Sequence, residues 1–306
     1  MAGEIRNIPA SVHQRLLAKA RESSRPFNEL LQHFAIERFL YRLSQSPQAG
    51  RFILKGALML SAWSKAMSRP TMDIDLSGKI ENDPAVLAAA MKDACRMDVA
   101  ADGMSFNAET VTAARIMEDA GYQGVRVRVQ GSLGNARVSL QVDIGFGDVI
   151  VPGPNRIIYP VLLDFPPPVL KGYSMESTIA EKFQAMVKRG ILNSRMKDFY
   201  DIWMLSRSFD FQGSTLARAV EKTFANRNMP LPVDPAVFDP SFVKDRDKNV
   251  QWRGFISKAK LADAPGAFAD VVAGVRIFLE PLTAALAGQR KFRGTWKAPG
   301  PWHPVS

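Results

Sequence analysis

Two short segments, LKGA at residues 54–57 and DIDL at residues 73–76, lie fifteen residues apart and form the central motif of this sequence. From Thr71 to Leu76 acidic and apolar residues alternate, which is typical of a short β-strand. Residues i and i+2 of a strand point to the same face, about 6.5–7 Å apart along the chain. We therefore expect Asp73 and Asp75 to project together while Ile74 packs into a core.

Such a pair of carboxylates predicts a bound cation. Two carboxylates this close repel each other, so a shared proton or a cation must compensate. Magnesium prefers oxygen ligands and often combines one or two carboxylates with substrate phosphates. Asp73 and Asp75 are therefore candidate magnesium ligands; the alternative is a solvated turn at the end of a strand.

Residues 124–151 carry the clearest β pattern and offer a third carboxylate. Valines alternate first with Arg126 and Arg128, and after a turn apolar residues alternate with polar ones up to Asp143. If this second strand neighbours the strand of Asp73, then Asp143 is a third metal ligand; the alternative is that it faces water. For the two arginines a solvated face is favoured over a track for an RNA backbone.

The segment before the acidic strand is suited to a phosphate-bearing ligand. Gly56 has no Cβ, so backbone can come close to a triphosphate. A helix predicted from Leu58 would add unpaired N–H donors at its N-terminus. Lys55 and Arg69 supply positive charge on either side.

Composition supports a phosphate-bearing partner and a reducing compartment. Lys and Arg number 40 among the 306 residues against 30 Asp and Glu, which gives a net charge of +10 and a field that attracts nucleotides and RNA. Cys95 is the single cysteine, so no internal disulfide can form. No apolar run approaches the roughly 20 residues that cross a bilayer. We expect a cytoplasmic protein.

The order of predicted elements indicates two domains. Helices are expected over residues 10–47 and 83–101, and six prolines without periodicity fill residues 152–171. Further helices follow up to residue 288, and the last eighteen residues are expected to be irregular. We place a catalytic domain with N-terminal helices at residues 1–170, and a helical domain with an irregular basic tail at residues 171–306.

Two segments of the second domain carry further charged candidates: ESTIAEKFQA at 176–185 and NSRMKDFYDI at 193–202. Lys182 lies one turn into a predicted helix and could reach a γ-phosphate; the alternative is an exposed ion pair. Asp198 and Asp201 share a helix face. They could form surface ion pairs, orient Lys182, or act as a general base for an acceptor hydroxyl, and Asp198 is the preferred candidate.

Together with FILKGA at 52–57 and RPTMDIDL at 69–76, these segments resemble the AbiEii/AbiGii family of nucleotidyltransferase toxins, over roughly residues 30–210. The resemblance implies an α+β fold, with a DNA polymerase β-like nucleotidyltransferase core of mixed sheet and helices followed by a helical C-terminal domain. It also implies the toxin of a type IV toxin–antitoxin or abortive infection system, with an antitoxin that need not bind it.

The resemblance assigns roles residue by residue. Gly56 falls in the phosphate-approach turn, Asp73 and Asp75 in the metal-binding pair, and Thr71 at a hydroxyl position two residues earlier. Lys182 matches a phosphate-contacting lysine, and Asp198 and Asp201 match the acids of the last motif. Ala57 departs from the usual second Gly or Ser, and alanine cannot easily adopt positive φ.

The sequence thus predicts a magnesium-dependent enzyme that transfers a nucleotide from an NTP to an acceptor hydroxyl, with RNA, a tRNA 3′ end, as the expected acceptor. Two alternatives stay open. One is an NTP- or RNA-binding module on the same fold without turnover, and the other is a nucleotidyltransferase for a small molecule.

Overall fold

The computed structural model describes residues 7–64, 71–118 and 122–304. The chain divides into two compact units. Unit 1 comprises Met1–Gly147 and Asn155–Gly172, and unit 2 comprises Asp148–Pro154 and Tyr173–Ser306. Within the described residues no helix is both long and apolar enough to cross a membrane.

Unit 1 is built on a seven-stranded mixed sheet with the strand order β3-β4-β5-β2-β1-β7-β6. β2 pairs antiparallel with β1 and parallel with β5, so the strand carrying the two aspartates lies near the middle of the sheet. The strands are β1 (Phe52–Lys55), β2 (Asp73–Gly78), β3 (Met104–Glu118), β4 (Tyr122–Leu133), β5 (Ala136–Gly145), β6 (Asn155–Ile158) and β7 (Val169–Gly172).

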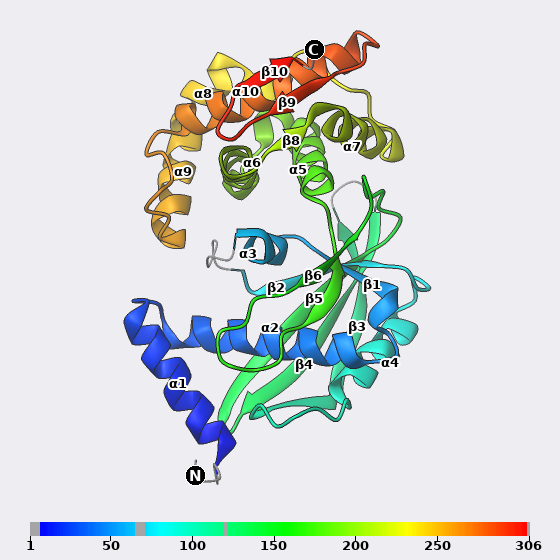
Figure 1. Ribbon diagram of the computed structural model, residues 1–306, viewed down its shortest axis with the longest axis vertical. Coiled ribbons are helices and arrows are strands. Elements are labelled where there is room, and N and C mark those ends of the chain that lie inside the picture. The colour runs from blue at the N-terminus through cyan, green and yellow to red at the C-terminus, as the bar shows by residue number, and fades with distance from the viewer. Residues whose placement is uncertain (1–6, 65–70, 119–121, 305–306) are drawn as a thin grey trace. The chain divides into compact units, whose positions relative to one another are not determined.

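Three helices pack on one face of strands β3–β5: α1 (Ile8–Glu22), α2 (Phe27–Gln45) and α4 (Pro84–Cys95) (Figure 1). The strand positions that point to this face are apolar, and Val127, Leu140 and Val142 are fully buried. The side chain of Asp83 accepts hydrogen bonds from the first turn of α4, which fixes where that helix begins. The polar positions of the same strands lie on the other face, which is where the predicted ligands fall.

Two parts of the sheet were not predicted from the sequence. β3 adds a fifteen-residue edge strand, and its alternation is interrupted by a bulge between Asn107 and Thr112. The proline-rich segment shows no periodicity in the sequence, but it contains β6 and most of β7, and β7 pairs parallel with β1.

Unit 2 is mainly helical, with a small three-stranded sheet in the order β10-β9-β8. Its core contains many aromatic rings; Phe199, for example, packs edge-on against Phe268 with ring centroids 5.1 Å apart. Its elements are α5 (Met175–Arg189), α6 (Met196–Ser208), α7 (Gly213–Asn226), α8 (Pro240–Lys244), α9 (Arg246–Ala259), α10 (Phe268–Ala287), β8 (Phe211–Gln212), β9 (Gly294–Trp296) and β10 (Trp302–Pro304).

The prediction of an irregular tail is wrong for the described part of the last eighteen residues. β9 and β10 pair with each other, and β9 pairs with β8. The indole of Trp296 is buried and donates a hydrogen bond to the carbonyl of Ser206 at 2.5 Å. The indole of Trp302 donates to the carbonyl of Phe278 at 2.8 Å. Strands of three residues are too short to give a recognisable alternation, so contacts of the buried Trp296 and the partly exposed Trp302, rather than a pattern, hold this tail.

Candidate active site

The register of the central strands of unit 1 places four charged residues in one row. Lys55 on β1 lies opposite Asp75 on β2, Asp75 lies opposite Asp143 on β5, and Asp143 lies opposite Arg126 on β4. Because residues that face each other across a sheet point to the same side, the order of charges across the sheet is positive, negative, negative, positive. We call these four residues the charged row.

Asp73 lies on the same face as the charged row, two residues before Asp75, and its register partner on β5 is Gln141. Both aspartates are partly exposed, whereas Ile74 between them is fully buried. The predicted arrangement of an acidic pair above an apolar anchor is therefore present in the structure.

Gly56 is required by both its backbone angle and its neighbour. It has a φ of +70°, in the left-handed region that favours glycine. A Cβ at this position would lie 2.7 Å from Cγ of Asp75. The turn after β1 and the second aspartate therefore fit together only because residue 56 has no side chain.

Ala57 stands where the family usually has a second Gly or Ser, and it does not need the positive φ that alanine adopts with difficulty. It is 7% exposed and does not have positive φ. Helix α3 (Leu58–Ser64) begins at the next residue, as expected. A second glycine is therefore not needed for this turn.

Asp143 is next to Asp75, as expected for neighbouring strands, but it is held by an arginine. Nε and Nη2 of Arg126 donate to its two carboxylate oxygens, each at 2.8 Å. Gln141 donates to the same carboxylate at 3.2 Å. Within the described residues no three His, Cys, Asp or Glu side chains are grouped as a metal site. The structure thus brings Asp143 to the aspartate pair without assembling a cluster of three carboxylates.

The remaining candidates of the first domain are only partly placed. Thr71 is partly exposed, two residues before Asp73. Lys55 is partly exposed at the end of β1. Arg69 lies outside the described residues.

In unit 2, Lys182 is held between two aspartates. Its Nζ lies 2.9 Å from Oδ1 of Asp198 and 2.7 Å from Oδ2 of Asp201. Arg195, whose role as a partner was not predicted, donates from Nε to Oδ2 of Asp198 at 2.5 Å. Both carboxylates are fully buried, and the lysine side chain is 12% exposed.

The electrostatics keep Asp198 ionised. Burial alone raises the pKa of this carboxyl group, but Lys182 and Arg195 outweigh it, so its pKa lies below the ordinary value of an aspartic acid. A buried carboxylate whose oxygens accept from two cations is a poor proton acceptor for a substrate. The geometry supports the alternative in which Asp198 and Asp201 orient Lys182.

Sequence similarity gives the family. The model of the nucleotidyl transferase AbiEii toxin of type IV toxin–antitoxin systems matches residues 38–274. The chain belongs to this family. It is therefore a nucleotidyltransferase of a toxin–antitoxin system, and AbiEii membership implies an NTP substrate and an antitoxin counterpart. The family, enzyme class and fold class predicted from the sequence are confirmed.

Solved structures are similar to this AbiEii chain. MenT4, a nucleotidyltransferase toxin from Mycobacterium tuberculosis, is 17% identical, with a TM-score of 0.50 over 92% of this chain and 99% of that chain. JHP933 from Helicobacter pylori is 12% identical, with a TM-score of 0.48 over 86% of this chain and 93% of that one. No functionally curated protein matches in sequence. At 17% identity the likeness to MenT4 is one of fold alone.

Proposed function

We propose that this AbiEii nucleotidyltransferase moves a nucleotide from an NTP to a hydroxyl at the 3′ end of an RNA, a tRNA being the expected acceptor, with Mg²⁺ held by Asp73 and Asp75. The main support is that the two aspartates share the face opposite the helix layer, with Asp75 packed against the glycine turn at Gly56. Because Asp75 fills the space that a Cβ of residue 56 would take, the backbone of the turn lies directly against a carboxylate proposed to hold the metal.

The donor set fits a hard divalent cation. Magnesium commonly takes one or two protein carboxylates and fills its remaining positions with phosphate oxygens and water, and two partly exposed aspartates on one strand meet that need. Asp143 is the third candidate ligand, which Arg126 would have to release. When bound, the metal would neutralise phosphate charge and help to align the entering and leaving oxygens.

The chain's own residues would bind and orient the NTP. Lys55, opposite Asp75, supplies a positive charge next to the carboxylate pair. Gly56 and Ala57 carry the backbone of the phosphate-approach turn, and Thr71 offers a hydroxyl shortly before β2. Catalysis of this kind consists mostly of positioning and charge neutralisation.

In unit 2 we propose Lys182 as a phosphate-contacting cation and Asp198 and Asp201 as its positioning residues. Two carboxylates fix the direction of its ammonium group within the buried cluster. A lysine pre-oriented in this way loses less side-chain entropy when it binds a phosphate.

An RNA acceptor is supported by charge. The net charge of +10 attracts polyanions. A cationic small-molecule acceptor would call instead for an acidic pocket.

The test is to incubate the protein with each α-labelled NTP, Mg²⁺ and total tRNA, alongside Asp73→Ala. We expect label on RNA with one or more NTPs and a loss of at least about 10³-fold in the variant, since charge stabilisation by a metal is worth several kcal/mol. Urea unfolding of both proteins checks that the variant is folded.

Three outcomes would contradict the proposal. Label on a small molecule without RNA indicates a small-molecule nucleotidyltransferase. NTP binding with no transfer from any NTP indicates a binding module. Equal transfer by Asp73→Ala would remove Asp73 from the metal site.

A further inference from the structure

The polar face of β3, β4 and β5 continues well beyond the charged row. Along β5 the side chains of Asp143, Gln141, Ser139 and Arg137 alternate with buried apolar ones. The neighbouring strands contribute the same kind of residue in register. We call this surface the open polar face, defined by Ser105, Asn107, Thr110, Thr112, Arg128, Gln130, Ser132, Arg137, Ser139 and Gln141.

The open polar face is positively charged and its arginines are available. Arg128 and Arg137 are exposed, and neither has a hydrogen-bond or ion-pair partner within the described chain. The ten residues that define the face include no acid. Asp143 lies at one end of it, already paired with Arg126. The charge of this face therefore complements a polyanion.

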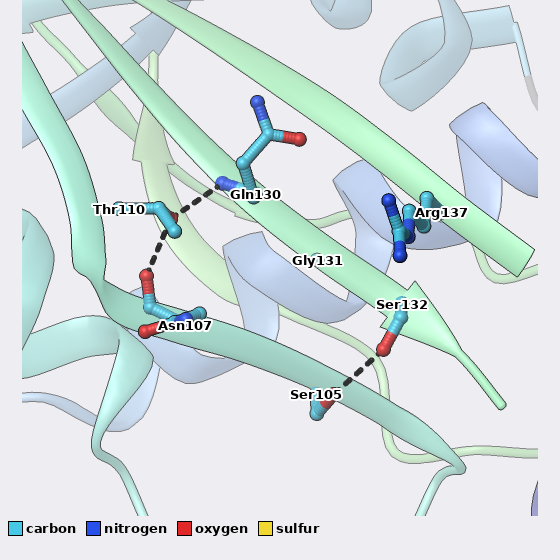
Figure 2. Close-up of a pocket in the computed structure, with 7 residues that line it drawn as sticks. All are labelled: Ser105, Asn107, Thr110, Gln130, Gly131, Ser132 and Arg137. Carbon is cyan, nitrogen blue, oxygen red and sulfur yellow. Dashed lines mark hydrogen bonds between the residues drawn. The ribbon is translucent and has the colours of Figure 1, made fainter. Parts of the chain in front are cut away.

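At the end away from the charged row, the face is hollowed into a pocket of about 420 Å³. Figure 2 shows Arg137 next to a group of hydroxyl and amide side chains. The hydroxyls of Ser105 and Ser132 are 3.0 Å apart, and the hydroxyl of Thr110 donates to the carbonyl of Asn107 at 2.7 Å. Guanidinium, hydroxyl and amide groups are the side chains that contact nucleic-acid phosphates and sugars.

The pocket and the aspartate pair are connected by one strand. From Asp143 to Arg137 the path along β5 is about 20 Å at 3.3 Å per residue. Gln141 and Ser139 lie between them on the same face. A nucleic-acid backbone along this line would pass from the pocket to the charged row.

The residues of this face suit recognition of a backbone rather than of bases. None of the ten residues that define it is aromatic, so a base-stacking platform is not present. RNA helices are recognised mainly through phosphates and 2′-hydroxyls, for which arginine, serine, threonine and glutamine are suitable partners.

We propose that the open polar face is the RNA-binding surface of this protein. It would hold the phosphate–ribose backbone of a helical stem, with Arg137 and the pocket at the distal end and the 3′ end directed to Asp73 and Asp75. This inference rests on the proposed RNA acceptor.

The test compares Arg128→Glu/Arg137→Glu with the wild-type protein in binding of a tRNA acceptor-stem hairpin across a salt series. Arg21→Glu is the matched control, since this exposed arginine lies on α1, in the helix layer of the opposite face. We expect the double variant to bind at least tenfold more weakly, with a slope of log affinity against log salt reduced by about two, one for each phosphate contact removed. Arg128→Gln/Arg137→Gln, with no new acids, should show a smaller loss in the same direction, and the affinity for Mg·NTP should not change.

Binding and transfer are measured separately, so the two proposals can fail independently. If the double variant and the wild-type protein bind the hairpin equally, or if Arg21→Glu weakens binding as much, the open polar face is not the RNA surface. If single-stranded DNA of the same sequence binds as tightly as the hairpin, a helical RNA is the wrong occupant. If the hairpin binds through this face but is never labelled, the face is supported and the proposed transfer to RNA is wrong.

Discussion

Aspartates lie in two different environments in the two units. In unit 1, Asp73 and Asp75 are partly exposed on an open sheet face, and two carboxylates, those of Asp75 and Asp143, are adjacent in register. In unit 2, Asp198 and Asp201 are fully buried and accept from Lys182 and Arg195. Exposure and the balance of nearby charge, rather than residue type, therefore distinguish the acids proposed to bind a metal from the acids proposed to orient a cation.

The largest expected effect is the difference in the free energy of unfolding between two variants, one that neutralises buried Asp201 and one that neutralises partly exposed Asp75. Asp201→Asn leaves an uncompensated positive charge in a buried cluster, so we expect a loss of about 3–5 kcal/mol in the free energy of unfolding. Asp75→Asn removes the repulsion between the Asp75 and Asp143 carboxylates at a partly exposed site. The free energy of unfolding should therefore change by less than about 1 kcal/mol. Urea unfolding of both variants measures the contrast, and equal losses would abolish the distinction between the two kinds of acid.

The second prediction concerns the packing of the glycine turn against Asp75, one of the two proposed metal ligands. Gly56→Ala places a Cβ against Asp75 and forces alanine to a φ of +70°. We expect a loss of about 2–4 kcal/mol from the left-handed backbone and the clash together, and a weaker affinity for Mg·NTP because Asp75 must move. Gly50→Ala is the control, since nothing lies within 4 Å of a Cβ there. Unfolding and NTP titration should separate the two variants; if Gly56→Ala matches its control, the turn is not constrained as described.

The smallest effect concerns a buried acid of unit 1 that has a cation on its own helix. Glu37 on α2 is fully buried, lies 2.9 Å from Nη2 of Arg38, and accepts from the amide of Leu162 at 2.7 Å. Burial raises its pKa to about 7, although Arg38 and the Leu162 amide act in the opposite direction. This pKa is above the ordinary value, so the folded protein binds the proton more tightly than the unfolded chain does.

Stability should therefore fall by about 2 kcal/mol as pH rises from about 5 to 7, and this contribution should become constant only above about pH 8, once the folded protein has also lost the proton. Glu37→Gln should remove most of the slope, which urea unfolding at several pH values measures. A slope unchanged in the variant would assign it to other groups. An increase of stability with pH would contradict the direction of the shift.

Local sequence patterns predicted the elements that have one covered and one open face. Residues 124–151 gave β4 and β5 because each strand buries alternate residues against helices. The alternation around Asp73 predicted β2, and it predicted that Asp73 and Asp75 point to the same face of the sheet. These predictions succeeded because the alternation of buried and exposed residues along a strand can be read from consecutive residues of the sequence.

Long-range pairing could not be predicted in the same way. The contact of Arg126 with Asp143 depends on the register between β4 and β5, and the burial of Asp198 and Asp201 depends on how α5 and α6 pack. The bulge in β3 hid its alternation, and β7 is a four-residue strand next to prolines. The site residues themselves were named from motifs, and their roles are proposals.

The order of strands in the charged row also bears on when the row can form during synthesis. Lys55 and Asp75 leave the ribosome before β3 and β4, and Asp143 follows only on β5, which then pairs between β4 and β2. Because domains generally fold as units during translation, an incomplete chain holds separated charges and no row. A truncated product that ends before β5 therefore lacks both Asp143 and the strand that lies between Arg126 and Asp75. Such fragments should therefore not be toxic to the cells that make them.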